Sequence, residues 1–357
     1  MKSKYKHCLI GILLIIVLGI TFEVQAQRNC GTMQALDQLM EKDPKLKGRM
    51  DKIEKRASSG QFGISDEIGI ITIPVVVHVV YNTTAENISE AQVLSQIEIL
   101  NDDFRRQNAD ADDTWAQAAD SKIKFVLATV DPEGKTTNGI TRTSTTKTSF
   151  DLDEQYDEMK FTSSGGYDAW PTGTYFNIWV CDIAGGILGY AQFPGGPADT
   201  DGVVIDYQYT GTIGTATAPF DEGRTGTHEV GHWLNLRHIW GDGGCGVDDS
   251  VDDTPESDAA NFNCVVGHVS CGTVDMVQNY MDYSDDACMN LFTDGQKTRM
   301  RALFESGGFR ESIINPEADP DPPAPFSCDS NILALTITFD NYPEETSWLI
   351  TNLADET

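Results

Sequence analysis

The sequence predicts an α+β fold, and three patterns near its first third indicate this. Residues 71–81 are rich in valine and isoleucine, as expected for a buried central strand. Residues 89–92, Ser-Glu-Ala-Gln, form a capping-box pattern, and apolar residues recur behind them at helical spacing as far as Phe104. Residues 123–127 alternate as in a further strand. The chain contains no internal repeat.

Further strands and one helix are expected before a long irregular loop. Residues 175–181 and 202–206 have strand-like composition, and the glycine-rich residues 185–191 suit an irregular edge strand. A helix should begin at about Thr225, and after Trp240 the chain becomes dense in Gly, Asp and Cys. A part with little regular structure should therefore follow the sheet and its helices.

The N-terminus has the pattern of an export signal. Residues 1–26 start with three lysines, continue with an apolar run from Leu9 to Ile20 and end on Val-Gln-Ala, so we predict a signal peptide and a secreted, extracellular protein. The apolar run is too short to span a bilayer comfortably, and no later segment could do so. We therefore expect no membrane insertion.

The chain is strongly acidic, with 55 Asp and Glu residues against 25 Lys and Arg and a formal net charge of −30. Phosphate backbones and anionic membranes would repel it, so we expect no nucleic-acid partner. Carboxylates are the oxygen ligands that Ca²⁺ takes, so calcium is an expected cofactor. The alternative is that the acidic surface serves only solubility.

Three of the six histidines lie within residues 228–238, His-Glu-Val-Gly-His-Trp-Leu-Asn-Leu-Arg-His. His228 and His232 are four residues apart, so on a helix they share one face and can bind one metal ion. Glu229 lies beside them, where it can contact a metal-bound water. On a straight helix His238 would point away, so the chain must turn before it.

Asn235 is the expected position of that turn, because Asn is second only to Gly in tolerating the left-handed conformation. Three neutral imidazoles leave one coordination position open, which is typical of a catalytic Zn²⁺ site. The alternative is a helix whose histidines only cap or pair at the surface. Glu229 and His238 argue against it, because both stand where metal chemistry requires them.

These residues resemble the extended zinc signature of the metzincin metallopeptidases, with Asn235 where most members have Gly. The resemblance implies a methionine-containing turn beneath the metal, and residues 279–283, Asn-Tyr-Met-Asp-Tyr, fit it. Met281 would form the apolar floor under the histidines. Tyr283 matches a tyrosine that some metzincins place near the zinc.

Among metzincins the chain most resembles the pappalysin family, over roughly residues 70–315. The likeness is carried by residues 176–180, 189–191, 228–240 and the Asp-Asp-Thr-Pro sequence at 252–255. It implies a metzincin-type two-lobed catalytic domain. The upper lobe would hold a twisted, mostly parallel mixed sheet with helices, and the lower lobe would be irregular and disulfide-linked.

The expected domain organisation follows from this resemblance. Residues 27–56 are polar and precede the first strand, so they suggest a propeptide, or else a flexible extension. Residues 57–315 would form the metallopeptidase catalytic domain. Residues 316–327 form a proline-rich linker, and residues 328–357 a strand-like tail that is too short for a domain of its own. The tail either packs on the main body or belongs to a longer protein.

Four cysteines lie between the zinc motif and Gln296, where crosslinks would restrain a region with little regular structure. An oxidising compartment favours disulfides, and a second zinc site is the competing interpretation. Four cysteines allow three pairings. The resemblance implies Cys245–Cys271 and Cys264–Cys288.

The same loop contains four aspartates and a threonine. Similar loops in the family bind calcium, and we expect the ligands to include Asp249, Asp252 and Thr254, although the spacing is not that of an EF-hand. The alternative is a solvated acidic loop.

Cys30 lies in the predicted propeptide, and its thiolate could occupy the open zinc position. The protein would then stay latent until it is cleaved near Arg56. Latent relatives have the same arrangement of a cysteine at the zinc. The alternative is a disulfide from Cys30 to Cys181 or Cys328.

The motif and the resemblance together predict a secreted zinc endopeptidase that acts on protein or peptide substrates. Zinc would lower the pKa of a water, Glu229 would take its proton and Tyr283 would help to stabilise the oxyanion. The substrate should lie extended along the edge strand near residues 186–191. The alternative is an inactive, protease-like binding or adhesion protein. Cleavage specificity and oligomeric state do not follow from the sequence.

Overall fold

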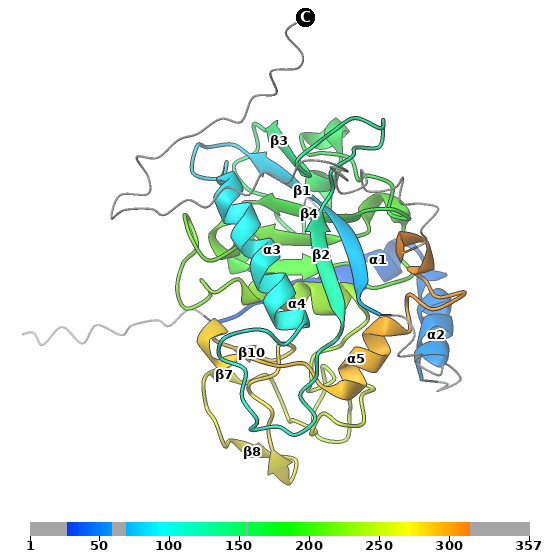
Figure 1. Cartoon of the computed structure of the whole chain (residues 1–357), viewed down its shortest axis with the longest axis vertical. Helices are drawn as coiled ribbons and strands as arrows, with labels where there is room; N and C mark the ends of the chain where they lie inside the picture. Colours follow the sequence, from blue (N-terminus) through cyan, green and yellow to red (C-terminus); the bar gives the residue numbers. More distant parts are fainter. Residues whose placement is uncertain (1–26, 59–68, 155, 315–357) are drawn as a thin grey trace, which may run out of the picture. The chain divides into compact units, whose positions relative to one another are not determined.

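The computed structural model describes residues 27–58, 69–154 and 156–314, and a six-stranded mixed sheet lies at its centre (Figure 1). The strand order is β2-β1-β4-β6-β5, and β3 also pairs with β1. The strands are β1 (Ile71–Tyr81), β2 (Ile123–Leu127), β3 (Ile140–Ser144), β4 (Phe176–Cys181), β5 (Gly189–Ala191) and β6 (Val203–Asp206). The predicted signal peptide, linker and C-terminal tail lie outside the described residues.

Strand β1 organises the sheet because it pairs along its whole length. Its first half pairs in parallel with β2 and its second half with β3, while β4 pairs in parallel on the other side. β4 in turn pairs in parallel with β6, and only the edge strand β5 is antiparallel. The expected mostly parallel mixed sheet is therefore confirmed, and the edge that it offers is β5.

Five α-helices occur among the described residues: α1 (Thr32–Lys42), α2 (Leu46–Ala57), α3 (Glu90–Phe104), α4 (Arg224–Trp233) and α5 (Asp294–Arg301). α3 packs against β2 and α4 (Figure 1). The main hydrophobic core joins apolar side chains of β1, α3 and α4, including Val77, Leu100 and Trp233. Every residue of α4 is buried in this packing.

The N-terminus of α3 differs in one detail from the predicted capping box. The Ser89 side chain accepts the main-chain N–H of Gln92, as expected. The Gln92 side chain does not return to Ser89. It is buried and donates to the carbonyls of Tyr207 and Thr210, because the loop that leads from β6 toward α4 offers it these acceptors. Gln92 therefore tethers that loop to α3.

The chain after α4 contains only very short strands, as the sequence predicts: β7 (Phe262–Asn263), β8 (Val269–Ser270), β9 (Thr273–Val274) and β10 (Tyr283–Ser284). Two disulfides link it, Cys245–Cys271 and Cys264–Cys288, which are the pairings implied by the resemblance. All four cysteines are thus used, which excludes a second zinc site built from their thiolates.

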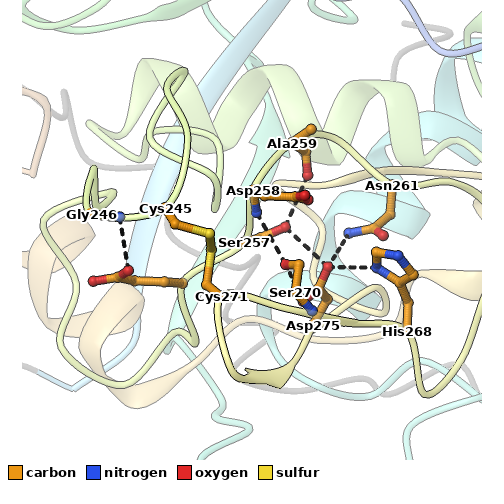
Figure 2. The surroundings of a disulfide bond; sticks show 11 residues. Cys245, Gly246, Ser257, Asp258, Ala259, Asn261, His268, Ser270, Cys271 and Asp275 are labelled. Atoms are coloured by element: carbon orange, nitrogen blue, oxygen red, sulfur yellow. Dashed lines mark hydrogen bonds and ion pairs between the residues drawn. A yellow bond between two sulfur atoms is a disulfide. The ribbon is translucent and has the colours of Figure 1, made fainter.

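A buried carboxylate organises the region around Cys245–Cys271 (Figure 2). Asp275 accepts hydrogen bonds from the side chains of Ser257, Asn261, His268 and Ser270. In this part of the chain, side-chain hydrogen bonds and disulfides replace the ladders of a sheet.

The described elements belong to the first of two units in the chain, Met1–Asp319, and the second, Pro320–Thr357, lies outside the described residues. None of the helices within the described ranges has the length and apolar character needed to cross a membrane.

Candidate active site

Helix α4 and the turn that follows it bring three histidines together. The Nε2 atom of His232 lies 3.2 Å from Nε2 of His228 and 3.1 Å from Nε2 of His238. All three side chains are almost completely buried. This arrangement excludes the alternative in which the histidines only cap or pair at the surface.

The other ring nitrogen of each histidine has its own partner. Nδ1 of His228 lies 2.7 Å from the carbonyl oxygen of Tyr280, and Nδ1 of His232 lies 2.8 Å from that of Leu236. Nδ1 of His238 lies 2.5 Å from the Asp242 carboxylate. Since carbonyl oxygens can only accept, Nδ1 of His228 and His232 carries the proton, which leaves a lone pair on Nε2.

The site fits a zinc ion. Burial lowers the pKa of His228 and of His232 well below the ordinary value, and the neighbouring histidines lower the pKa of His228 further, so both rings stay neutral. Facing lone pairs repel one another without a cation between them. Nitrogen ligands of a tetrahedral zinc site lie roughly 3.3 Å apart, close to the separations observed here. Partners on Nδ1 are also typical of zinc-binding histidines.

The turn between the second and third histidines occurs where the sequence predicts it. α4 ends at Trp233, and Asn235 has a φ of 73°, in the left-handed region. The chain then reverses and brings His238 back to the site, where its ring stacks on Trp240 at a centroid distance of 4.4 Å. Asp242 and Trp240, which the sequence analysis did not single out, thus fix the third histidine.

Met281 packs against helix α4, and a glycine makes this close approach possible. Met281 is fully buried, and a Cβ atom on Gly231 would lie only 2.4 Å from its sulfur. Gly231, which lies between His228 and His232 in the zinc motif, is therefore needed for this packing, and the sequence analysis missed its role. Tyr283 lies at the side of the site, with ring centroids 5.0 Å from His238 and 5.7 Å from His228.

The N-terminal segment 29–32 enters this site beside strand β5. Gly31 N–H donates to the Gly189 carbonyl and Leu188 N–H to the Asn29 carbonyl, both at 2.9 Å, and Cys30 pairs in parallel with Gly189. The Cys30 sulfur forms one group with the ring nitrogens of the three histidines, all within 4.8 Å of one another. Cys30 and Cys181 are free thiols, so the alternative Cys30–Cys181 disulfide is absent. Cys328 lies outside the described residues.

Glu229 faces this segment. Its Oε2 atom accepts hydrogen bonds from the Thr32 hydroxyl at 2.9 Å and from the Cys30 thiol at 3.4 Å. Burial raises the pKa of Glu229 to about 7, although both hydrogen bonds act in the opposite direction. Burial and the nearby Glu229 raise the pKa of the Cys30 thiol, an effect that a bound cation reverses.

Comparisons with known proteins agree with this geometry. The family model for pregnancy-associated plasma protein-A, a peptidase family, matches residues 163–305. An extracellular metalloprotease of Pyricularia oryzae is 31% identical over 297 residues, which cover 79% of this chain and 90% of that protein. The solved structure of a promirolysin mutant from Tannerella forsythia matches with 45% identity and a TM-score of 0.74, covering 80% of this chain and 97% of the other. Mature mirolysin from the same organism, in complex with a cleaved peptide, matches with 51% identity and a TM-score of 0.67, covering 69% and 96%.

The chain belongs to the pappalysin family of metallopeptidases. The metzincin-type α+β fold and the assignment as a metalloendopeptidase are thereby confirmed.

Arg28, two residues before Cys30, makes a second buried contact with the rest of this pappalysin-family peptidase. The Arg28 guanidinium donates to Asp286 Oδ1 at 2.5 Å, to the Ser284 carbonyl at 3.2 Å and to the Thr225 hydroxyl at 3.3 Å. Asp286 Oδ2 accepts the main-chain N–H groups of Glu222 and Arg224, so the same carboxylate serves the first turn of α4. Sequence reasoning missed this pair, since only the fold brings its members together.

The predicted calcium ligands of this pappalysin-family peptidase are only partly brought together. Thr254 donates to Asp249 Oδ1 at 2.8 Å, and Asp249 is buried. Asp252 is exposed. Asp253 instead accepts from the Thr293 hydroxyl and the Gly295 N–H, and so supports the start of α5.

Proposed function

We propose that this pappalysin-family chain is a secreted zinc endopeptidase that is made in a latent form, with zinc held by His228, His232 and His238. The observation that carries the proposal is the convergence of three buried Nε2 atoms beside the Glu229 carboxylate. A bound zinc ion would activate water and polarise the peptide carbonyl.

Glu229 is the general base in this proposal. It accepts the proton of the attacking water and returns it to the leaving amine. A pKa of about 7 suits a group that takes up and releases a proton near neutral pH. Tyr283 donates a hydrogen bond to the developing oxyanion, since burial raises its pKa and keeps the hydroxyl protonated.

Latency would come from the segment around Cys30. This segment pairs with the edge strand β5, the place where an extended substrate would add to the sheet. The Thr32 hydroxyl donates a hydrogen bond to the Glu229 carboxylate, and the Cys30 sulfur lies where a fourth zinc ligand would be. Cleavage near Arg56 would release residues 27–56 and uncover all three positions.

The Arg28 contact favours substrates with a basic side chain. Release of the propeptide would leave the buried Asp286 carboxylate without its guanidinium partner. An arginine of the substrate can restore that charge-assisted bond, whereas an apolar side chain would leave the charge unpaired. We therefore expect this peptidase to select arginine next to the cleaved bond.

A calcium ion near Asp249 also remains part of the proposal. Asp249 Oδ2 is buried without a hydrogen-bond partner, and burial raises the pKa of this carboxyl to about 7. A hard cation would satisfy the oxygen. Calcium should raise the melting temperature of the wild type and of Asp248→Asn, but not of Asp249→Asn. An equal rise in all three would place the ion elsewhere.

The assignment is tested with the purified full chain, before and after limited proteolysis near Arg56. We expect one zinc per chain, and cleavage of an unstructured protein only after proteolysis, with loss of activity in a chelator. Glu229→Gln should retain zinc and lose about a thousandfold or more in kcat/KM. Glu98→Gln, an exposed change on α3, is the matched control. Zinc with full activity in Glu229→Gln would contradict the proposed base.

Substrate selection is tested with paired peptides that differ only in arginine or citrulline next to the cleaved bond. The processed wild type should prefer arginine by about a hundredfold in kcat/KM, and Asp286→Asn should remove most of this preference. Equal rates for both peptides in the wild type would refute the proposed preference and leave the zinc assignment intact.

A further inference from the structure

Two arginines donate hydrogen bonds to main-chain carbonyls at the end of α4 and in the turn that leads to the third histidine. The last carbonyls of a helix have no partner within the helix. Arg310 Nε and Nη2 donate to the carbonyl of Trp233, at 3.2 and 3.0 Å. Arg299 Nε donates to the carbonyl of Asn235 at 2.6 Å. Both arginines are at most 4% exposed, so these bonds are protected from water.

Arg310 pairs with Asp201, a residue of the predicted catalytic domain. Its guanidinium donates to both oxygens of Asp201, at 2.7 and 3.0 Å, and lies 3.6 Å from the ring centroid of Trp233. The Trp233 indole N–H donates to the same carboxylate. This contact is independent of residues 27–56 and should persist after their removal.

Arg299, in contrast, is paired with the predicted propeptide. Its Nη1 donates to Oε1 of Glu54 at 2.6 Å, and its Nη2 donates to Oε2 of the same side chain. Glu54 belongs to α2, and Figure 1 shows α2 beside α5, the helix that carries Arg299. One guanidinium thus links the propeptide to the Asn235 carbonyl, between the second and third histidines.

We propose that Arg299 is a positioning residue for His238, acting through the Asn235 carbonyl, and that its pair with Glu54 is a further attachment point of the propeptide, separate from residues 28–32. The inference rests on the proposed function, because it assumes a zinc site and a removable propeptide. Fork-shaped arginine–carboxylate pairs fix geometry as well as charge. The propeptide therefore holds the site at Cys30 and, independently, at the turn that delivers the third ligand.

The positioning effect is tested in the processed enzyme with Arg299→Gln and Arg299→Lys. We expect Arg299→Gln to bind zinc about tenfold more weakly and to lower kcat with little change in KM. Arg299→Lys can still donate to one carbonyl and should recover part of both. Arg105→Gln, which removes the arginine–carboxylate pair with Asp120 just after α3, is the matched control. A lower melting temperature with unchanged zinc affinity and kcat would show a merely structural contact and overturn the proposal.

The attachment is tested in the full chain with Glu54→Gln against Asp51→Asn. Asp51 is exposed on the same helix and forms an ion pair with Lys47 of that helix. Glu54→Gln should shorten the delay between cleavage and activity about tenfold, and Asp51→Asn should not. The processed enzymes should be identical, since both positions are removed. Full activity of the uncleaved wild type would refute the latency proposal, whereas a latent wild type with equal delays in both variants would refute the attachment.

Discussion

Two glycines determine how closely the active-site helix approaches its neighbours. A Cβ atom on Gly189, in β5, would lie 2.9 Å from the Glu229 side chain, and one on Gly231 would lie 2.4 Å from the sulfur of Met281. Neither residue has a positive φ, so the requirement is space and not backbone conformation. Because these positions have no side chain, Glu229 can approach β5 and Met281 can approach α4.

Substitution of Gly231 tests this close approach. Gly231→Ala should destabilise the protein by about 1–3 kcal/mol and weaken zinc retention, because Met281 or α4 must shift. Urea denaturation and zinc analysis measure the two effects. Gly48→Ala is the control, since nothing lies within 4 Å of a Cβ there and alanine favours its helix by about 0.5–1 kcal/mol. Equal stability of Gly231→Ala and wild type would contradict the packing argument.

At the scale of elements, the N-terminal segment extends the sheet at β5. Residues 29–32 use main-chain hydrogen bonds to β5 and its neighbour Leu188, and the Ala191 N–H donates to the Thr32 hydroxyl. Helix α1 follows and buries Ala35 and Leu36. The N-terminal segment is therefore fixed by pairing with an edge strand and by the packing of the helix that follows it.

Removal of the Cys30 thiol tests whether this sulfur maintains latency. The uncleaved Cys30→Ser chain should be at least about tenfold more active than the uncleaved wild type, because a thiolate–zinc bond contributes much of the affinity of the segment. Peptide hydrolysis before proteolysis is the measurement. Cys181→Ser, at the other buried free thiol, should stay latent. Latency of Cys30→Ser equal to wild type would place inhibition in the other contacts of the segment, those of its main chain and of Thr32 and Arg28.

Strand β1 carries one buried polar side chain, His78, which lies away from the three active-site histidines. Its Nδ1 lies 2.8 Å from the Thr141 hydroxyl on β3, and its Nε2 lies 3.0 Å from the Asn177 side-chain oxygen on β4. Burial lowers the pKa of His78 to about 4, although the bond to Asn177 opposes the shift. His78 therefore links three strands as a neutral ring.

The lowered pKa predicts acid destabilisation between about pH 6.5 and pH 4. The unfolded chain takes up a proton on His78 below about 6.5, whereas the folded protein does so only near 4. The contribution of His78 to the free energy of unfolding is therefore complete above about pH 6.5. It decreases as the pH is lowered, by about 3 kcal/mol in total. The difference in unfolding free energy between wild type and His78→Gln, measured by urea denaturation across this range, should show that slope. Parallel curves would contradict the prediction.

At the scale of the whole molecule, the part after α4 depends on crosslinks more than on secondary structure. Cys264–Cys288 encloses the Met281 turn, and Cys288 lies two residues after Asp286. The disulfide therefore holds the Met281 turn, which packs against Gly231 of α4, and the carboxylate that binds Arg28 in one loop. Loss of this crosslink should affect both stability and catalysis.

The double change Cys264→Ser and Cys288→Ser should lower the free energy of unfolding by about 3 kcal/mol, the loop-closure value for cysteines 24 residues apart. It should also reduce activity of the processed enzyme. Denaturation in urea and kcat/KM are the measurements, with Cys181→Ser as control. Unchanged stability would mean that the hydrogen bonds around Asp275 suffice to hold this region.

The sequence by itself determined the features that depend on local periodicity. His228, Glu229 and His232 share one helix, and Asn235 permits the turn that returns His238, so their spacing alone predicted the centre of the site. The valine-rich β1 and the irregular part after α4 were predictable for the same reason. The disulfide pairing came only from the family resemblance, because spacing allows three pairings.

Only the tertiary structure decided the contacts between distant parts of the chain. The carbonyl that fixes His228 belongs to Tyr280, 52 residues away, and a main-chain carbonyl has no signature in the sequence. Arg28 and Asp286 are 258 residues apart, and Glu54 and Arg299 are 245 apart. Any acidic residue of this strongly acidic chain could have paired with either arginine. Packing of the sheet, the helices and the disulfide-linked part selected one partner for each, because a buried charge is stable only where a partner is already in place.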